Sequence, residues 1–217
     1  MARRASRLTR RVIHFFDFGA TWQTKNGFRV ATLRIVSGMT SGNVSRFARH
    51  FVSNESEIFD GGCDCGLIRY RLTRTPLFVH CCHCRWCQRE TGSAFVLNAL
   101  IETECMARLH GEPERVPTPS ASGKGQDIAR CPDCRVALWS HYAGAGPLFT
   151  FVRIGTLDDP DRFPPDIHIF TMSKQPWVIL PEGVPVMREY YDREQYWPRE
   201  SLERRAAMLA KSSAKVG

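Results

Sequence analysis

The amino-acid sequence predicts a mainly β protein, made of many short strands and held together by metal-binding turns, with short helical segments. Three observations support this fold class. Segments of about four to eight residues alternate apolar and polar side chains, as half-buried strands do, and clusters of Gly, Pro, Ser and Asp separate them. Seven of the nine cysteines stand in close pairs or in a triplet, which is the spacing of zinc-binding turns.

Residues 1–57 form the first segment of the chain. They hold ten Lys or Arg against three Asp or Glu, and the part from Met1 to Arg11 shares the Arg-rich, acid-poor composition of mitochondrial transit peptides. The segment has no clean amphipathic period. We therefore expect a disordered extension, or sequence that precedes a true start at Met39, in preference to a targeting peptide.

The folded part is expected to begin near residue 58. The C-x-C-G pattern places Cys63 and Cys65 in a tight turn, and the flanking glycines permit the positive φ that such a turn requires. Residues 67–72 alternate as a half-buried strand does, so a hairpin that carries two thiols is the simplest structure. A second strand at residues 77–80 then leads into the triplet Cys82-His83-Cys84-Arg85-Trp86-Cys87.

The remaining elements follow in the same style. Strands are predicted downstream at residues 93–100, 106–110, 136–142, 149–154 and 167–170. The stretch 113–126 is rich in Pro, Ser and Gly and should be a loop, and residues 155–160 should form a turn. The one predicted helix covers residues 198–210, whose good helix formers need not pack on the core.

The positive charge of the chain lies in its two ends. Of the formal net charge of +8, residues 1–57 contribute +7 and residues 199–217 contribute +3, which leaves −2 for residues 58–198. Phosphate contacts need clustered Lys and Arg, so no nucleic-acid partner is expected for the core. No apolar run approaches the roughly 18 residues of a membrane span, so no membrane partner is expected either.

The cysteines are expected to bind metal rather than to form disulfides. Their odd number, their close spacing and the lack of a secretory signal argue against a secreted disulfide framework and favour a reducing, cytoplasmic location. Cys105 stands alone, and a small buried apolar side chain describes it better than a metal ligand does.

The other thiols divide into two candidate zinc sites. Two knuckles far apart in sequence can close one four-thiolate site, with the ligands Cys63, Cys65, Cys131 and Cys134. The triplet then forms a separate site with three protein ligands, and zinc bound in this way keeps its fourth position for water or substrate. A competing division joins the second knuckle to two cysteines of the triplet. Spacing also leaves open whether the third ligand beside Cys84 and Cys87 is Cys82 or Cys81.

Five blocks of the sequence together resemble a known family. The blocks are Gly61-Gly62-Cys63-x-Cys65-Gly66-x-x-Arg69-Tyr70, then Cys82-His83-Cys84-x-x-Cys87 with Gly92-Ser93-Ala94-Phe95, then Cys131-x-x-Cys134, Gly155-Thr156-Leu157-Asp158-Asp159-Pro160, and His168-Ile169-Phe170 with Ser173-Lys174-x-Pro176-Trp177. Their order and content resemble the glutathione-dependent formaldehyde-activating enzyme family, which also includes centromere protein V. The resemblance covers about residues 58–185, with residues 186–217 as a C-terminal extension that contains a helix.

The resemblance implies a β-tent, Mss4-like fold with two zinc ions per chain. Carried over by position, the structural zinc ligands are Cys63, Cys65, Cys131 and Cys134, and the catalytic zinc ligands are Cys82, Cys84 and Cys87. Cys81 is then not a ligand of either ion. Arg135 departs from the family, which usually has Gly after the second knuckle, and a residue with a Cβ is strained there if the turn requires positive φ.

The activity that the resemblance implies is that of S-(hydroxymethyl)glutathione synthase, a carbon–sulfur lyase that joins formaldehyde to the thiol of glutathione. Binding at a three-thiolate zinc would deprotonate the incoming thiol at neutral pH, and its sulfur could then attack the aldehyde carbon. The expected partners are therefore a small-molecule thiol and an aldehyde. The alternative is a non-catalytic, zinc-stabilised binding module of the centromere protein V type.

Other polar residues of the five blocks are candidates for substrate contacts. Arg89 and Lys174 could bind the carboxylates of glutathione, and His168 or His83 could donate to the developing alkoxide. Each histidine also has a structural alternative, with His83 supporting the turn and His168 as a hydrogen-bonded core residue. Trp177 is predicted to belong to the core rather than to a substrate platform.

Overall fold

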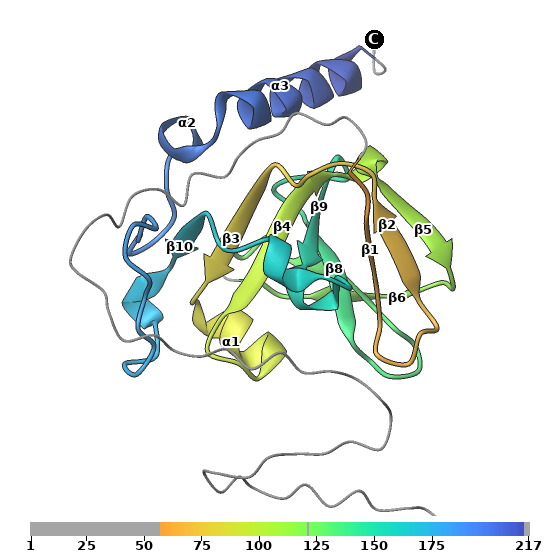
Figure 1. Ribbon diagram of the computed structural model, residues 1–217, viewed down its shortest axis with the longest axis horizontal. Helices are drawn as coiled ribbons and strands as arrows, with labels where there is room; N and C mark the ends of the chain where they lie inside the picture. Colours follow the sequence, from red (N-terminus) through yellow and green to blue (C-terminus); the bar gives the residue numbers. More distant parts are fainter. Residues whose placement is uncertain (1–56, 121, 215–217) are drawn as a thin grey trace, which may run out of the picture. The chain divides into compact units, whose positions relative to one another are not determined.

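The structure, a computed structural model, describes residues 57–214 apart from residue 121 (Figure 1). Nearly all of the N-terminal extension expected at residues 1–57 thus lies outside the described residues. The regular secondary structure of the described part is mainly β, as predicted, with these strands: β1 Phe59–Gly62, β2 Arg69–Leu72, β3 Phe78–Cys82, β4 Val96–Glu102, β5 Met106–His110, β6 Glu114–Thr118, β7 Gln126–Arg130, β8 Ala137–Tyr142, β9 Phe149–Arg153 and β10 Ile167–Ile169. The helices are α1 Arg85–Thr91, α2 Arg193–Tyr196 and α3 Arg199–Ser213.

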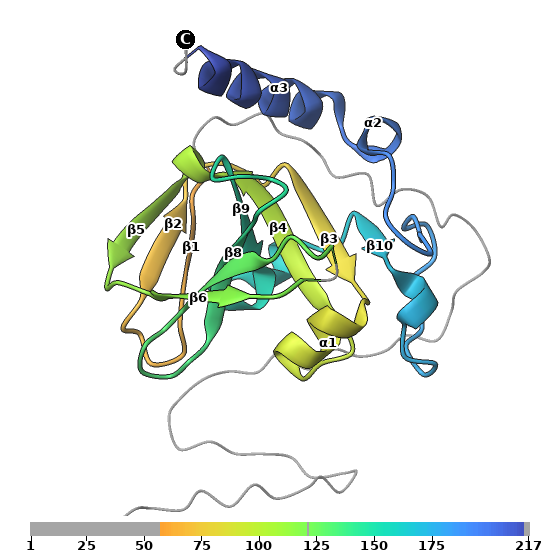
Figure 2. The same cartoon turned by 180° about the vertical axis from the view of Figure 1, so that it is seen from behind.

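The strands form two sheets that face each other. The larger sheet has the order β10-β3-β4-β9-β8-β7-β6, and the smaller sheet has the order β1-β2-β5. Neighbouring strands are antiparallel except for β10, which pairs parallel to β3 at the edge of the larger sheet. Figure 2 shows the smaller sheet against the part of the larger one that carries β8 and β6, away from β10.

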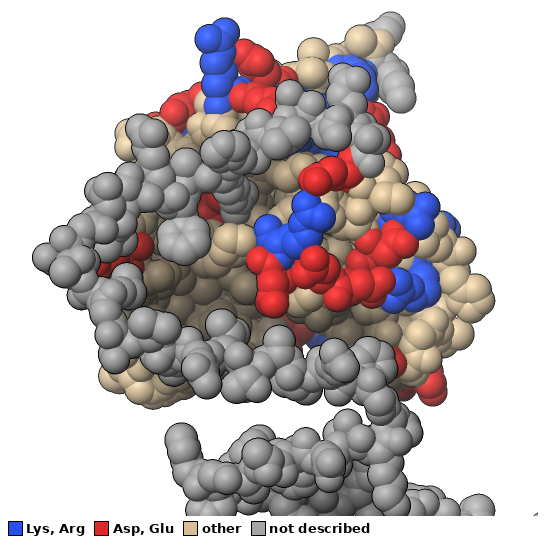
Figure 3. All heavy atoms as spheres, in the orientation of Figure 1, with Lys and Arg blue, Asp and Glu red and all other residues tan. Residues whose placement is uncertain are grey.

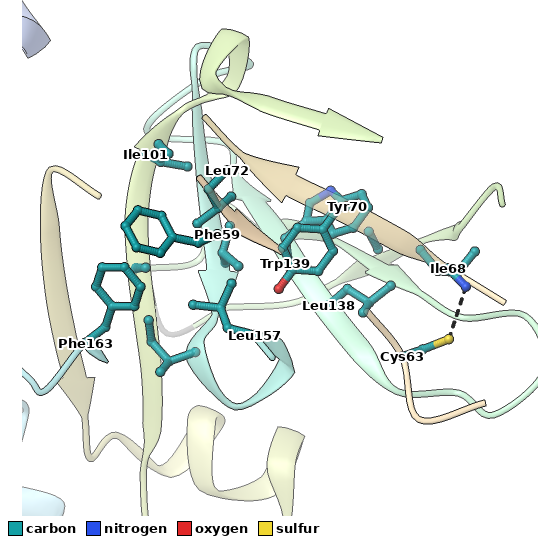
Figure 4. Packing of buried hydrophobic residues seen from close by; sticks show 14 of the residues in the cluster. Phe59, Cys63, Ile68, Tyr70, Leu72, Ile101, Leu138, Trp139, Leu157 and Phe163 are labelled. Atoms are coloured by element: carbon teal, nitrogen blue, oxygen red, sulfur yellow. Dashed lines mark hydrogen bonds between the residues drawn. The ribbon is translucent and has the colours of Figure 1, made fainter. Parts of the chain in front are cut away.

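The main core lies between the two sheets (Figure 4). Tyr70 of β2 packs edge-on against Trp139 of β8 with their ring centroids 5.5 Å apart, and its hydroxyl hydrogen-bonds with Thr156 at 2.7 Å. Phe59 and Phe163 make a similar edge-on pair. Since these side chains come from both sheets, their burial fixes the position of one sheet on the other.

Gly61 and Gly62 have a different role from the predicted one. Both lie in strand β1, and the positive φ of the following turn, 78°, belongs to Gly66. A Cβ at Gly61 would come within 2.6 Å of both the Thr156 carbonyl oxygen and the Tyr70 ring. Glycine is therefore needed at Gly61 for close packing, because no larger residue fits there.

Two other local predictions were wrong. The loop expected at residues 113–126 contains strand β6, which carries Pro117. Proline is tolerated there because β6 is the edge strand of its sheet. The strand expected from residue 93 begins only at Val96, since the preceding residues 85–91 form helix α1, which was not predicted.

Helix α3 confirms the predicted C-terminal helix, and it packs on the larger sheet. The Ser201 hydroxyl donates to the Leu77 carbonyl at 2.7 Å, and the Arg204 guanidinium makes a two-pronged ion pair with Glu102 at 2.9 and 2.7 Å. Figures 1 and 2 show α3 near one end of strands β3 and β4 and α1 near their other end. Within residues 57–214, none of the helices combines the length and the apolar character that crossing a bilayer requires.

Charged side chains are mixed on the surface of the described part. On the face that Figure 3 shows, Lys and Arg lie interspersed with Asp and Glu. Several of them form exposed ion pairs, such as Arg69 with Asp158 and Arg162 with Glu57. Ion pairs of this kind each contribute little to stability, about 0–1 kcal/mol.

Candidate metal centres and substrate groove

The first candidate metal centre lies between two turns that come from different sheets. The turn after β1 supplies Cys63 and Cys65, and the turn between β7 and β8 supplies Cys131 and Cys134; their four sulfurs lie within 4.8 Å of one another. The Sγ atoms of Cys63 and Cys65 are 3.5 Å apart, and those of Cys65 and Cys131 are 3.6 Å apart. Sulfurs at about 2.3 Å from a tetrahedral zinc are roughly 3.8 Å apart, so this cluster has the dimensions of a zinc site.

Backbone N–H groups around the first centre favour thiolates at Cys63 and Cys134. The Ile68 N–H donates to the Cys63 sulfur at 3.2 Å. The N–H groups of Val136 and Cys65 lower the pKa of Cys134 to about 6. Arg135, the residue that departs from the family pattern, has a φ of 64°. This turn therefore places a residue with a Cβ in the left-handed region, where it is strained.

The second candidate centre is formed by the triplet. Cys82 ends strand β3, Cys84 is the N-cap of helix α1, and Cys87 lies within that helix; the three sulfurs lie within 4.8 Å of one another. The Cys84 sulfur accepts a hydrogen bond from the Cys87 backbone N–H at 3.4 Å. Cys82 and Cys87 are buried and Cys84 is half-buried.

The three thiols of the triplet compete for negative charge. Hydrogen bonds from Cys82 and Cys87 lower the pKa of Cys84 to about 2, whereas the hydrogen bonds with Cys84 and Cys87 raise the pKa of Cys82. The cluster thus tolerates one thiolate but resists a second one unless a cation is present. A divalent metal removes this conflict, so the donor set fits a zinc ion with three protein ligands.

The loop that carries the triplet is fixed by its own hydrogen bonds. The His83 carbonyl accepts from the Gln88 side-chain amide at 2.7 Å and from the Ser173 hydroxyl at 3.0 Å. Helix α1 is capped by Gly92, whose left-handed φ of 68° closes the last turn. Nothing in the sequence indicates that residues near position 173 lie beside this loop, so the hydrogen bond from Ser173 could not be predicted.

A groove of about 610 Å³ runs along helix α1, which carries Cys87. Its lining residues come from two segments that are far apart in sequence: Arg85, Gln88, Arg89, Gly92, Ser93, Ala94, Gln175 and Trp177. The volume is within the usual range of small-molecule sites, about 300–1,000 Å³. The Gln88 amide oxygen accepts from Arg85 Nη1 at 2.7 Å and from the Gln175 amide at 3.0 Å, which links the two segments.

Trp177 lines this groove, and its prediction as a core residue was wrong. Its side chain is 72% exposed, and the buried apolar position of the segment is taken by Val178. The Lys174 ammonium donates to the Gln175 and Val178 carbonyls at 3.0 and 2.6 Å, which closes the loop and turns residues 176 and 177 toward solvent.

The substrate-binding candidates do not all reach the groove. Arg89 lines it, whereas Lys174 is engaged by the carbonyls of its own loop. His168 is 5% exposed, and its Nδ1 lies 3.0 Å from Nε2 of the fully buried His83. Cys105 is buried in the main core, as expected, and belongs to neither thiol cluster.

Sequence reasoning missed Arg85, Gln88 and Gln175 as groove residues. Had helix α1 been recognised, its period would have placed Arg85, Gln88 and Arg89 on one face. No signal in the sequence connects this face with Gln175.

Comparison with known proteins gives one informative match. The sequence model of a family described as "Glutathione-dependent formaldehyde-activating enzyme" matches residues 58–173, which is more than half of the chain. No curated protein matches the sequence. A crystal structure of a Rhodobacter sphaeroides protein is similar at 14% identity and a TM-score of 0.35, covering 46% of this chain and 87% of that one, and a likeness at this level adds no argument about function.

Proposed function

The chain belongs to the glutathione-dependent formaldehyde-activating enzyme family, and from this premise we propose that it is a zinc-dependent carbon–sulfur lyase of the S-(hydroxymethyl)glutathione synthase type. It would join a thiol, glutathione in the first place, to formaldehyde or a related aldehyde. The observation that carries the proposal is the cluster of three sulfurs at the start of helix α1, the helix that also lines a groove with two arginines.

The proposal assigns two zinc ions to the described residues. Cys63, Cys65, Cys131 and Cys134 would hold a structural ion, and Cys82, Cys84 and Cys87 would hold the catalytic one. When bound by three thiolates, zinc supplies positive charge that lowers the pKa of an incoming thiol and keeps a position for its sulfur. Nine free cysteines suit the reducing conditions of the cytoplasm, where we propose the enzyme works.

The groove would recognise the acidic ends of the thiol substrate. Arg85 and Arg89 are both exposed and line one wall, where their guanidinium groups can form two-pronged hydrogen bonds with carboxylates. The bond from Arg85 to Gln88 limits the freedom of the Arg85 side chain. Trp177 offers an exposed ring on the opposite segment, against which the peptide part of glutathione can pack.

Two earlier substrate candidates take supporting roles in this proposal. Lys174 shapes the loop that presents Trp177, and His168 lies buried beside His83. We propose that residues 58–185 carry the chemistry. The segment after residue 185 braces them through Trp197, which stacks on Phe78 of β3 with ring centroids 5.4 Å apart.

The experiment that tests the proposal is NMR exchange spectroscopy of formaldehyde with glutathione. The zinc-loaded full chain should accelerate formation of S-(hydroxymethyl)glutathione, and Cys84→Ser should abolish the acceleration. Arg89→Ala should weaken the response to glutathione about tenfold or more, because one charge-assisted hydrogen bond is worth about 1.5–3 kcal/mol. Arg108→Ala, which removes an exposed arginine on β5, is the matched control.

Glutathione diethyl ester separates recognition of carboxylates from a general loss of activity. The ester has no free carboxylates, so Arg89→Ala should act on it as the unaltered protein does. If the unaltered protein does not accelerate the exchange with glutathione, the glutathione-specific proposal is refuted. If Arg89→Ala affects ester and acid equally, the assignment of the groove is wrong.

A further inference from the structure

We propose that Cys81, His83 and His168 form a third metal site, suited to zinc, on the opposite side of strand β3 from Cys82. The proposal is independent of the catalytic assignment above. The three side chains are 1%, 0% and 5% exposed, and one ligand atom from each lies within 4.8 Å of the others.

The pairing of the strands brings these residues together. Cys81 and His83 are two positions apart, so along an extended chain they point to one side while Cys82 points to the other. His168 of β10 is the direct partner of Cys81 in the parallel pair of β10 with β3. The loop after β3 thus presents one set of ligands on each side of the chain.

Hydrogen bonds cannot satisfy the three atoms together. His83 Nε2 lies 3.5 Å from the Cys81 sulfur and 3.0 Å from His168 Nδ1. In the neutral ring this nitrogen has either one proton or one lone pair, so it makes one good hydrogen bond and leaves the other neighbour poorly satisfied. A cation at the common centre accepts electron pairs from all three atoms at once.

The spacing agrees with such a cation. With zinc at about 2.3 Å from sulfur and 2.0–2.1 Å from nitrogen, tetrahedral geometry gives separations of roughly 3.5 Å for sulfur to nitrogen and 3.3 Å for nitrogen to nitrogen. The first agrees with the Cys81–His83 distance, and the second requires the two rings to separate by a few tenths of an ångström. Binding would place the ring protons on His83 Nδ1 and His168 Nε2, which have no protein partner among the described residues with or without a metal.

One thiolate and two neutral imidazoles would give this zinc centre a net charge of +1. The triplet with its own zinc carries −1, so the two centres on either side of the loop have opposite charges. The ion would tie β10, which is only three residues long, to the end of β3. Its role would therefore be to fix the loop that carries the triplet.

The test is the zinc content of the full chain, measured by mass spectrometry after saturation with zinc and removal of the excess. Cys81→Ser and His168→Gln should each contain one ion fewer than the unaltered protein, and the double variant should also contain only one fewer, because the two residues share an ion. Cys105→Ser, which changes a buried thiol outside every cluster of the described residues, should contain as much as the unaltered protein.

The test compares the zinc content of each variant with that of the unaltered protein. Its result therefore does not depend on whether the catalytic site is filled. Combining Cys81→Ser with Cys84→Ser should remove two ions, one from each side of the loop. Equal zinc content in the unaltered protein, Cys81→Ser and His168→Gln would overturn the proposal. The proposal would also be overturned if the double variant of Cys81→Ser and His168→Gln contained two zinc ions fewer than the unaltered protein.

Discussion

Replacing Cys131 by Ser should unfold the protein or lower its melting temperature by about 10 °C or more. Cys131 has no solvent exposure, packs within the main core and brings the β7–β8 turn to the Cys63–Cys65 turn of the other sheet. Structural zinc sites contribute about 10–16 kcal/mol of apparent binding free energy, whereas a whole domain is stable by about 5–15 kcal/mol. Losing half of the zinc contribution, about 5–8 kcal/mol, would consume a third or more of this stability.

Cys84→Ser is the matched variant, because it removes one thiol from the other cluster. Cys84 is half-buried at the N-cap of α1, and serine is itself a good N-cap residue. We therefore expect this variant to lose one zinc ion but to keep its fold, with a melting temperature only a few degrees lower.

Differential scanning calorimetry and zinc analysis of both variants decide the matter. For a domain of this size, each kcal/mol changes the melting temperature by about 2–4 °C, so a loss of 5 kcal/mol or more in Cys131→Ser corresponds to at least 10 °C. The division into a structural and a catalytic centre is refuted if Cys84→Ser unfolds like Cys131→Ser. It is equally refuted if Cys131→Ser melts like the unaltered protein.

Three further predictions concern stability. Arg204→Ala leaves the Glu102 carboxylate, 5% exposed, without its cation and should cost about 3–5 kcal/mol in urea unfolding, whereas removal of the exposed Arg199 should change little. Arg135→Gly relieves the positive φ and should raise the free energy of unfolding by about 0.5–1 kcal/mol in the same assay; a decrease would contradict the strain. Burial and then Arg115 lower the pKa of His141 below 6.5, so the folded state binds fewer protons and stability should fall as pH drops below about 6.5. In His141→Gln this part of the pH dependence should disappear from denaturation curves, and an unchanged slope would refute the assignment.

The sequence predicted the thiol clusters well because their information is local. A C-x-C or C-x-x-C turn brings two sulfurs to one point whatever the rest of the chain does, so only the choice of partners was left open. The strands at residues 106–110 and 136–142 were likewise predicted from local alternation. The structure confirms the predicted mainly β fold, which was inferred from the same local alternation.

Features that depend on distant contacts could not be predicted in this way. The need for glycine at Gly61 comes from Tyr70 and Thr156, which approach it from other segments. The groove joins helix α1 to residues 175 and 177, which lie more than eighty positions further along the chain. Trp177 was misassigned for this reason, since a tryptophan in isolation is expected to be buried.

The proposed catalytic role of the triplet requires one position of its metal to stay open while the fold stays rigid. An ion that exchanges its fourth ligand needs its other three held by the protein, and here each thiol has a different support. Cys82 lies at a strand end, Cys84 at a helix cap and Cys87 within the helix. The groove arginines Arg85 and Arg89 stand on the helix that carries Cys87, so a movement of α1 would shift this thiol and the arginines together. The distance between Cys87 and the arginines that we propose bind carboxylates is therefore set by one short helix. The Gln88 side-chain amide ties this helix to the His83 and Ser173 carbonyls at 2.7 and 2.9 Å.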